Sequence, residues 1–253
     1  MTIALRKQFR QQSLPQVSFG PFRFLEALPW LIMAAAMRVI AFGGGAVAFP
    51  AILVASIAVL HAFLVVAQRA IEFNDGQTTI GELEFADQFK LTKAVLWRIA
   101  VLMLAADCSL MLAGYVGIAP HMMEGLDGMA FDQWTDVGKL WSAVIAALVL
   151  LMIVDAERNN GRVSFFRALR EFGQRALWVG AAIVVLGAVY LGLGVGQGWV
   201  RSAIWNFWQL SSSSQFIKNL IYFVFIFSFA MLRLWVTLLI LTYGLKQSYV
   251  RGS

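Results

Sequence analysis

Long apolar stretches separated by short polar segments make up most of the chain. Six stretches are long enough to cross a bilayer as helices, which takes about 20 residues, and they cover 24–44, 46–68, 94–118, 138–155, 176–198 and 217–243. Their apolar residues are continuous and do not alternate with polar ones as membrane strands would. The pattern predicts an all-α, polytopic transmembrane helical bundle of about six spans. A basic N-terminal segment (1–23) and a short C-terminal tail (244–253) would flank the membrane domain (24–243).

The composition agrees with this class, and the placement of charge predicts the orientation. Of the 253 residues, 60% are hydrophobic and 13% are charged, whereas about 25% are charged in ordinary soluble domains. Basic residues gather at the N-terminus, around 69–93, at 158–175 and in the tail, while the connection 119–137 holds only acidic charges. Because cytoplasmic connections carry the excess of Lys and Arg, both termini are expected in the cytoplasm. The net charge of +6 therefore follows topology and does not indicate a nucleic-acid partner.

The first span is the weakest of the six. Arg38 interrupts its apolar run, and three glycines follow at 43–45. An interfacial helix here would leave five spans and would place the arginines of 158–175 outside, against the charge rule. The residues 46–48 (Ala-Val-Ala) fit a signal-peptide cleavage site, but Arg38 within the apolar region argues against cleavage. We therefore expect six spans.

A weak internal repeat links two cytoplasmic connections. Glu72, Asn74 and Gly76 recur 85 residues later as Glu157, Asn159 and Gly161. In each copy a glycine can end one helix in the left-handed conformation. A hydroxyl residue can then cap the next helix. Ser164 is the candidate N-cap in the second copy, and 79–82 (Thr-Ile-Gly-Glu) fits a capping box in the first. Duplication and coincidence are both open explanations.

The second elbow, RVSFFRALREFGQR, predicts an interfacial helix. Phe165, Leu169 and Phe172 share one helical face, which would lie in the acyl boundary. Four arginines surround this face and are candidates for contact with anionic headgroups: Arg162, Arg167, Arg170 and Arg175. Alternatively, the arginines serve only to set the topology.

The sequence offers no constellation for catalysis, metal binding or a cofactor. It contains two histidines, His61 and His121, and one cysteine, Cys108, so no Cys/His zinc cluster can form. The carboxylates of the loop 119–137 lack the spacing of a calcium loop. We therefore expect a non-enzymatic protein without a cofactor.

Ionisable residues inside spans are the main clue to function, because each is costly in lipid and needs a partner. Asp107 falls near the centre of the third predicted span, Arg38 in the outer third of the first and Arg233 in the inner third of the last. Asp107 is expected to pair with Arg233, and Arg38 is the rival for the same carboxylate. Such a pair would hold helices together or line a substrate or proton path; a lipid-exposed Arg233 is a further alternative.

Small residues in the fifth span predict close helix contact. Gly192 and Gly196, and likewise Gly194 and Gly198, stand four residues apart. This spacing lets two helix backbones approach each other, either within the protein or between two copies.

The elbow at 157–175, with its Asn-Gly turn, its SFFRALREF run and its direct passage into a span, resembles a recurring element of bacterial six-helix membrane proteins. It is similar to the membrane domain attached to some glycerophosphodiester phosphodiesterases. In that family the chemistry resides in a separate soluble domain, so the resemblance carries over no catalytic residue. It implies a six-span bundle in the bacterial cytoplasmic (inner) membrane with a lipid-facing or partner-facing role.

Together these features favour a membrane scaffold, an assembly factor or a lipid-interacting accessory subunit. Its expected partners are membrane lipids, anionic at the cytoplasmic face, together with other membrane proteins or a second copy of the chain. The alternative is a small transporter or channel that uses Asp107 and the intramembrane arginines. An intramembrane enzyme acting on lipid is a third, weaker hypothesis.

Overall fold

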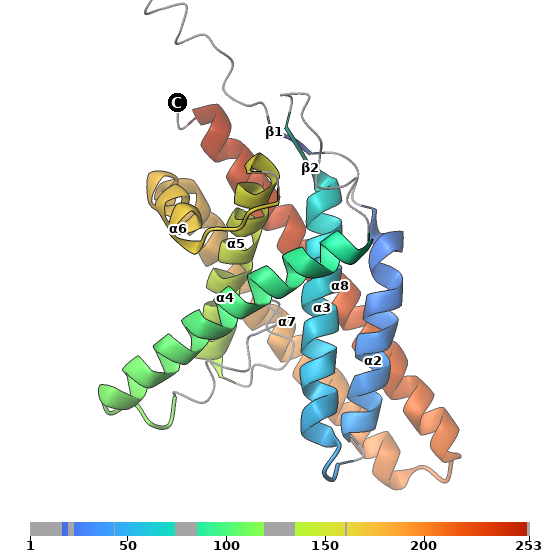
Figure 1. The fold of residues 1–253 in the computed structure, drawn as a ribbon. Coiled ribbons are helices and arrows are strands. Elements are labelled where there is room, and N and C mark those ends of the chain that lie inside the picture. Colours follow the sequence, from blue (N-terminus) through green and yellow to red (C-terminus); the bar gives the residue numbers. More distant parts are fainter. Residues whose placement is uncertain are drawn as a thin grey trace, which may run out of the picture.

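The computed structural model describes residues 17–19, 23–42, 44–73, 85–118, 135–159 and 161–251, and it confirms an all-α helical bundle (Figure 1). The helices are η1 (Phe24–Ala27), α2 (Leu28–Phe42), α3 (Ala48–Ala70), α4 (Phe85–Leu112), α5 (Asp136–Arg158), α6 (Phe165–Gln174), α7 (Ala176–Leu210) and α8 (Gln215–Arg251). Two short strands, β1 (Val17–Phe19) and β2 (Ile71–Phe73), pair antiparallel with Val17 opposite Phe73. The sequence pattern did not predict this strand pair.

Within the described residues, six helical segments are long and apolar enough to cross a membrane, as predicted, so the chain is an integral membrane protein. They cover Phe24–Phe42, Ala48–Ala67, Phe89–Leu112, Asp136–Ala156, Ala176–Leu210 and Gln215–Tyr249. The last two are longer than the sequence suggested, and α8 continues through most of the expected tail to Arg251. The third is shorter at its end, because the chain leaves the helix after Leu112 and Gly114 takes a positive φ of 87°.

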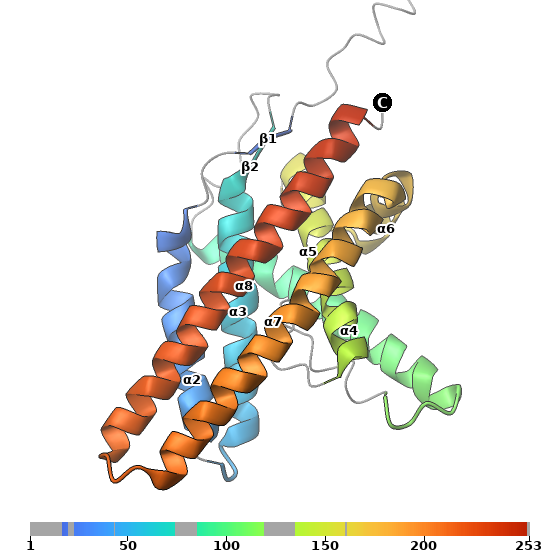
Figure 2. The same cartoon turned by 180° about the vertical axis from the view of Figure 1, so that it is seen from behind.

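Two helices form the centre of the bundle. The second half of α3 and most of α5 are buried, and α5 is apolar on every side over 143–154. A helix that is hydrophobic all round is suited to a position among other helices. The long helices α7 and α8 pack along each other, with α5 against α7 and α2 against both α3 and α8 (Figure 2).

Helix α4 differs from the others because it crosses the bundle obliquely and is largely exposed (Figure 1). Its buried stripe, Leu91, Val95, Ile99 and Met103, repeats every four residues and faces α3 and α5. The residues that follow Met103 are exposed or only partly buried. The second half of α4 therefore projects away from the bundle.

The bundle has two distinct ends. At one end, which we name the elbow end, lie the strand pair, the connection from α5 to α6 and the end of α8 (Figures 1 and 2). At the other, the turn end, lie the connections from α2 to α3 and from α7 to α8. The described parts of the segments whose basic residues predict a cytoplasmic location therefore lie at the same end of the bundle, the elbow end.

Candidate functional site

The elbow between α5 and α6 forms through local signals that the sequence predicts. Gly161 adopts a positive φ of 81°, and its N–H donates to the carbonyl of Ala156 at 2.8 Å. Ser164 is the N-cap of α6, and its hydroxyl accepts from the N–H of Arg167 at 3.5 Å. Both predictions for this elbow are confirmed. The corresponding residues 74–84 of the first copy lie outside the described residues, so the repeat stays a prediction.

A buried carboxylate, which the sequence analysis did not single out, fixes the elbow. Asp155 is 4% exposed, and its two oxygens accept from Nε of Arg167 at 2.7 Å and from the N–H of Ser164 at 2.8 Å. Asn159 adds a third donor at 3.0 Å. The hydrogen bond to Asp155 raises the pKa of the half-exposed Arg167 guanidinium. The proximity of Asp155 to the arginine-rich elbow was the available signal, and it was missed.

A second contact fastens the far end of α6 to α8. The guanidinium of Arg175 lies 3.6 Å from the ring centroid of Tyr249 and 3.5 Å from a carboxylate oxygen of Glu171. It also donates to the carbonyl and hydroxyl of Ser248, each at 3.3 Å. The Tyr249 hydroxyl in turn donates to Glu171 at 2.9 Å. Arg175 is therefore a link between helices and differs from the headgroup contact that the sequence suggested.

The outward face of α6 holds fewer of the predicted residues than expected, and it is rotated about the helix axis by about one residue position. Phe165 and Phe172 pack against the core beside the buried Ala168, so they do not lie in the acyl boundary. Leu169 is 46% exposed, as predicted for the outward face, and Phe166, which was not predicted there, is 81% exposed. This correction arises because the bundle, and not lipid, covers the face that periodicity identified.

Arg162 and Arg170 remain available at this surface. Both are exposed, and neither side chain makes a hydrogen bond or ion pair with another side chain in the described part of the chain. Of the four predicted headgroup residues, Arg167 and Arg175 thus have structural partners, and Arg162 and Arg170 are free to contact a ligand.

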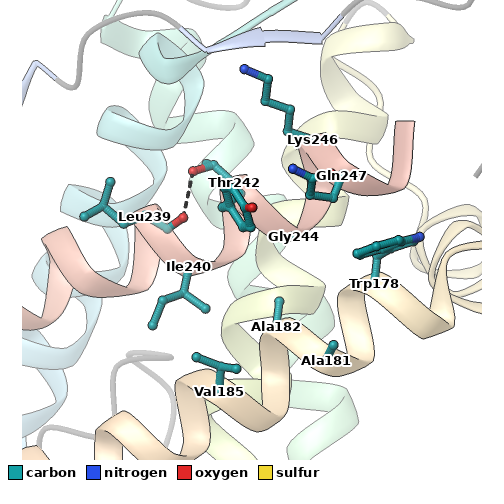
Figure 3. A pocket seen from close by; sticks show the side chains of 11 residues that line it. Trp178, Ala181, Ala182, Val185, Leu239, Ile240, Thr242, Gly244, Lys246 and Gln247 are labelled. Atoms are coloured by element: carbon teal, nitrogen blue, oxygen red, sulfur yellow. Dashed lines mark hydrogen bonds between the residues drawn. The ribbon is translucent and has the colours of Figure 1, made fainter. Parts of the chain in front are cut away.

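A groove lies between α7 and α8 close to the elbow end (Figure 3). It encloses about 660 Å³ and is bordered by apolar side chains such as Val185, Leu239 and Ile240. Trp178, Lys246 and Gln247 lie toward its elbow end (Figure 3). Its size is within the roughly 300–1,000 Å³ range of sites that hold one small ligand.

The intramembrane charges are arranged differently from the prediction. Arg233 is completely buried, and its guanidinium donates to Oε1 of Gln197 on α7 at 2.7 Å. The ring of Tyr190 lies 5.7 Å from the same guanidinium, and its hydroxyl bonds Thr237 at 2.6 Å. Arg233 therefore faces the bundle interior, as expected, but its guanidinium donates to a side-chain amide and not to the carboxylate of Asp107.

The expected ion pair of Asp107 with Arg233 or Arg38 is not formed. Asp107 is partly exposed, and it makes no ion pair or hydrogen bond with any residue that the structure describes. It lies five residues before the end of α4 at Leu112, or about 7.5 Å, and not at the middle of a span. The projecting half of α4 carries it away from the bundle.

Arg38 is buried in α2 near the turn end. It stands one turn before Phe42, whose ring contacts those of Tyr222 and Trp208 at centroid distances of 4.4 and 5.1 Å. Tyr222 precedes Arg233 by 11 residues on α8, or about 16 Å along the helix axis. The two arginines therefore occupy separate layers of the bundle.

Of the two glycine pairs expected to allow close helix contact, only Gly194 meets a neighbouring side chain. A Cβ at Gly194 would lie 2.8 Å from Cε of Lys139 on α5, whereas Gly192, Gly196 and Gly198 face open space. A close approach of α7 to α8 lies at Gly244, a glycine that was not predicted to make one. A Cβ at Gly244 would lie 2.6 Å from Cβ of Ala182.

The titratable His61 is held inside the bundle by a hydrogen bond and by aromatic contacts. It is buried in α3, its Nδ1 bonds the hydroxyl of Thr92 at 2.7 Å, and the ring lies against those of Trp30 and Phe89. Within the described ranges, no group of three or more His, Cys, Asp or Glu residues could hold a metal ion. His121 and most of the acidic loop lie outside those ranges.

Comparison of the chain with known protein families, with curated proteins and with solved structures finds no match. The resemblance of the elbow to bacterial six-helix membrane proteins thus stays a prediction.

Proposed function

We propose that this integral membrane protein is a non-enzymatic scaffold or accessory subunit whose elbow end contacts anionic lipid at the cytoplasmic face of a bacterial inner membrane. The observation that carries the proposal is that α6 is fixed to the bundle at both ends and exposes basic and apolar side chains. This helix is docked on the bundle by Asp155 at its start and by Arg175 at its end. It presents Arg170 and apolar side chains outward, and Arg162 lies exposed in the connection just before it.

This surface has the chemistry of a membrane interface. Phe166 and Leu169 supply apolar contact at the level of the acyl boundary, and the two arginines supply charge for phosphate groups. Arginine can also form two parallel hydrogen bonds with one phosphate. Because α6 is held in place by its internal contacts, it loses little conformational freedom when lipid binds.

The electrostatic contribution is large enough to measure. Each basic residue near an anionic surface contributes about 1 kcal/mol, so Arg162 and Arg170 together would favour anionic lipid by about 2 kcal/mol, or roughly 30-fold. Exposed charges are screened beyond about 8 Å at physiological ionic strength. The preference should therefore decrease as salt is added.

The test is lipid enrichment around the purified protein. Wild type and the double variant Arg162→Gln with Arg170→Gln are placed in nanodiscs of phosphatidylglycerol and phosphatidylcholine, and the lipids that remain after detergent extraction are counted. The variant should lose most of the salt-sensitive enrichment in phosphatidylglycerol.

The matched control is Arg162→Lys with Arg170→Lys, which keeps both charges and should keep the enrichment. If the glutamine variant holds as much phosphatidylglycerol as wild type at every salt concentration, α6 is only a topology signal and the proposal is wrong.

A small transporter or channel is the second candidate, and one observation favours it. Arg233, Gln197, Tyr190 and Thr237 form polar contacts between α7 and α8 inside the span region, and intramembrane charge often marks a transport path. Reconstituted vesicles provide the test: uptake of an anion that is lost in Arg233→Gln would favour this reading.

A further inference from the structure

The groove between α7 and α8 combines an apolar floor with a positive charge at one end. We propose that it binds a single anionic phospholipid, with an acyl chain along Val185 and Ile240 and the phosphate beside Lys246. This inference rests on the proposed lipid-interacting function and assigns that function a specific site.

The position of the groove matches the depth of a lipid headgroup. Trp178 on α7 and Tyr243 on α8 both line it, and such side chains are enriched where the hydrocarbon core meets the headgroups. Arg175, directly before α7, contacts the end of α8. Figure 3 shows Trp178, Lys246 and Gln247 toward one end and Val185 and Ile240 further along the two helices. The polar end of the groove therefore faces the elbow end, and its apolar part extends toward the centre of the span.

Close packing of α7 against α8 forms the base of the groove, and the opposite side of the groove is open toward lipid. Gly244 and Ala182 approach each other so tightly that a Cβ at Gly244 would lie 2.6 Å from Cβ of Ala182 and 3.2 Å from the carbonyl of Trp178. The helix backbones meet there, while Ala181 and Tyr243 border the same groove with their side chains exposed. Small residues on one wall leave space that a flexible hydrocarbon chain can fill.

Charge determines which lipid is favoured. Moving an acyl chain from the bilayer into an apolar groove gains little, because lipid tails are as apolar as the groove. Selectivity must therefore come from the headgroup. Lys246 is exposed and makes no hydrogen bond or ion pair with any described residue, and the described side chains that line the groove include no carboxylate. This arrangement suits a phosphate with net negative charge.

Two substitutions test the charged end of the groove and its apolar space separately. Lys246→Gln removes the charge and should weaken retention of phosphatidylglycerol about fivefold, which corresponds to about 1 kcal/mol. Its matched control is Lys93→Gln, an equal charge change at an exposed position on α4. Ala181→Phe fills the groove and should abolish the retained lipid whatever its headgroup. Its control is Ala188→Phe, the same change at an exposed position two turns further along α7 and outside the groove.

The measurement is native mass spectrometry of protein released from nanodiscs of phosphatidylglycerol and phosphatidylcholine, with circular dichroism to confirm that each variant is folded. Wild type and both controls should retain one phosphatidylglycerol per chain. The site is also separable from the α6 surface, because Arg162→Gln with Arg170→Gln should reduce salt-sensitive enrichment and leave the single retained lipid in place. Loss of that lipid in the arginine variant, with full retention in Ala181→Phe, would overturn the groove and leave the α6 proposal standing.

A second measurement on the wild-type protein does not depend on how the variants fold. Phosphatidylglycerol with a photoreactive acyl chain should form adducts concentrated in 178–185 and 239–247, more strongly than the phosphatidylcholine probe. Adducts spread evenly over the exposed faces of all spans, with no difference between the two probes, would show that the groove holds no specific lipid and that the inference is wrong.

Discussion

The contact between Arg233 and Gln197 gives the sharpest test of how the helices are paired. The donor–acceptor distance is 2.7 Å, Arg233 is fully buried and Gln197 is 9% exposed. Hydrogen bonds to charged groups contribute about 1.5–3 kcal/mol in proteins, whereas interhelical hydrogen bonds in membranes average about 0.6 and reach about 1.7 kcal/mol. We expect a coupling free energy of about 1–2 kcal/mol between Arg233→Leu and Gln197→Leu in a double-mutant cycle.

The companion cycle pairs Arg233→Leu with Asp107→Leu. Asp107 makes no ion pair with a described residue and lies on the projecting half of α4. The two effects should therefore add to within about 0.3–0.5 kcal/mol, as for independent sites. Only the cycle, and not the single variants, isolates the pairwise interaction, because replacing a buried charge by an apolar side chain can itself stabilise a protein.

The assay is reversible unfolding in mixed micelles with increasing sodium dodecyl sulfate, followed by the helical circular dichroism signal. Each cycle requires the wild type, two single variants and one double variant. A coupling of 1 kcal/mol or more to Asp107, combined with none to Gln197, would refute the reasoning. It would place α4 against α8 and restore the ion pair that the sequence suggested.

Three further predictions concern packing, the elbow and the topology. Gly244→Val should lower the free energy of unfolding by about 1–3 kcal/mol through overpacking. Gly196→Ala, which meets open space, should leave the free energy of unfolding unchanged or raise it by up to about 1 kcal/mol; equal losses in both would contradict the close contact. Asp155→Asn should speed hydrogen exchange at the Ser164 amide and along α6, measured by mass spectrometry; unchanged protection would mean that Arg175 alone holds α6. Reporters fused after residues 75, 125, 165, 205 and 253 should read inside, outside, inside, outside and inside, and an outside C-terminus would remove the first span.

The features that the sequence predicted correctly depend on neighbouring residues. The number of spans follows from the length of each apolar stretch, because a helix in lipid must satisfy its own backbone hydrogen bonds. The helix stop at Gly161 and the cap at Ser164 depend only on residues within one or two turns. The role among membrane lipids, which the arginines of the elbow suggested, stays a proposal.

The features that the sequence missed depend on which helix faces which. Hydropathy ended the last span near residue 243, but α8 continues to Arg251, and Arg175 contacts it at Ser248 and Tyr249. The contact of Arg233 with Gln197 was missed for a similar reason, because the two residues are 36 positions apart in the sequence.

The amino-acid sequence by itself determined that six apolar helices form and where a capped elbow begins. Only the tertiary structure decided that α4 projects with Asp107, that Arg167 and Arg175 bind protein groups, and that α7 and α8 enclose a groove. The physical reason is that lipid tails are as apolar as the helix surfaces, so hydrophobicity does not distinguish a lipid-facing side from a helix-facing one. Shape and polar complementarity select the contacts between helices, and both depend on residues brought together from distant parts of the chain.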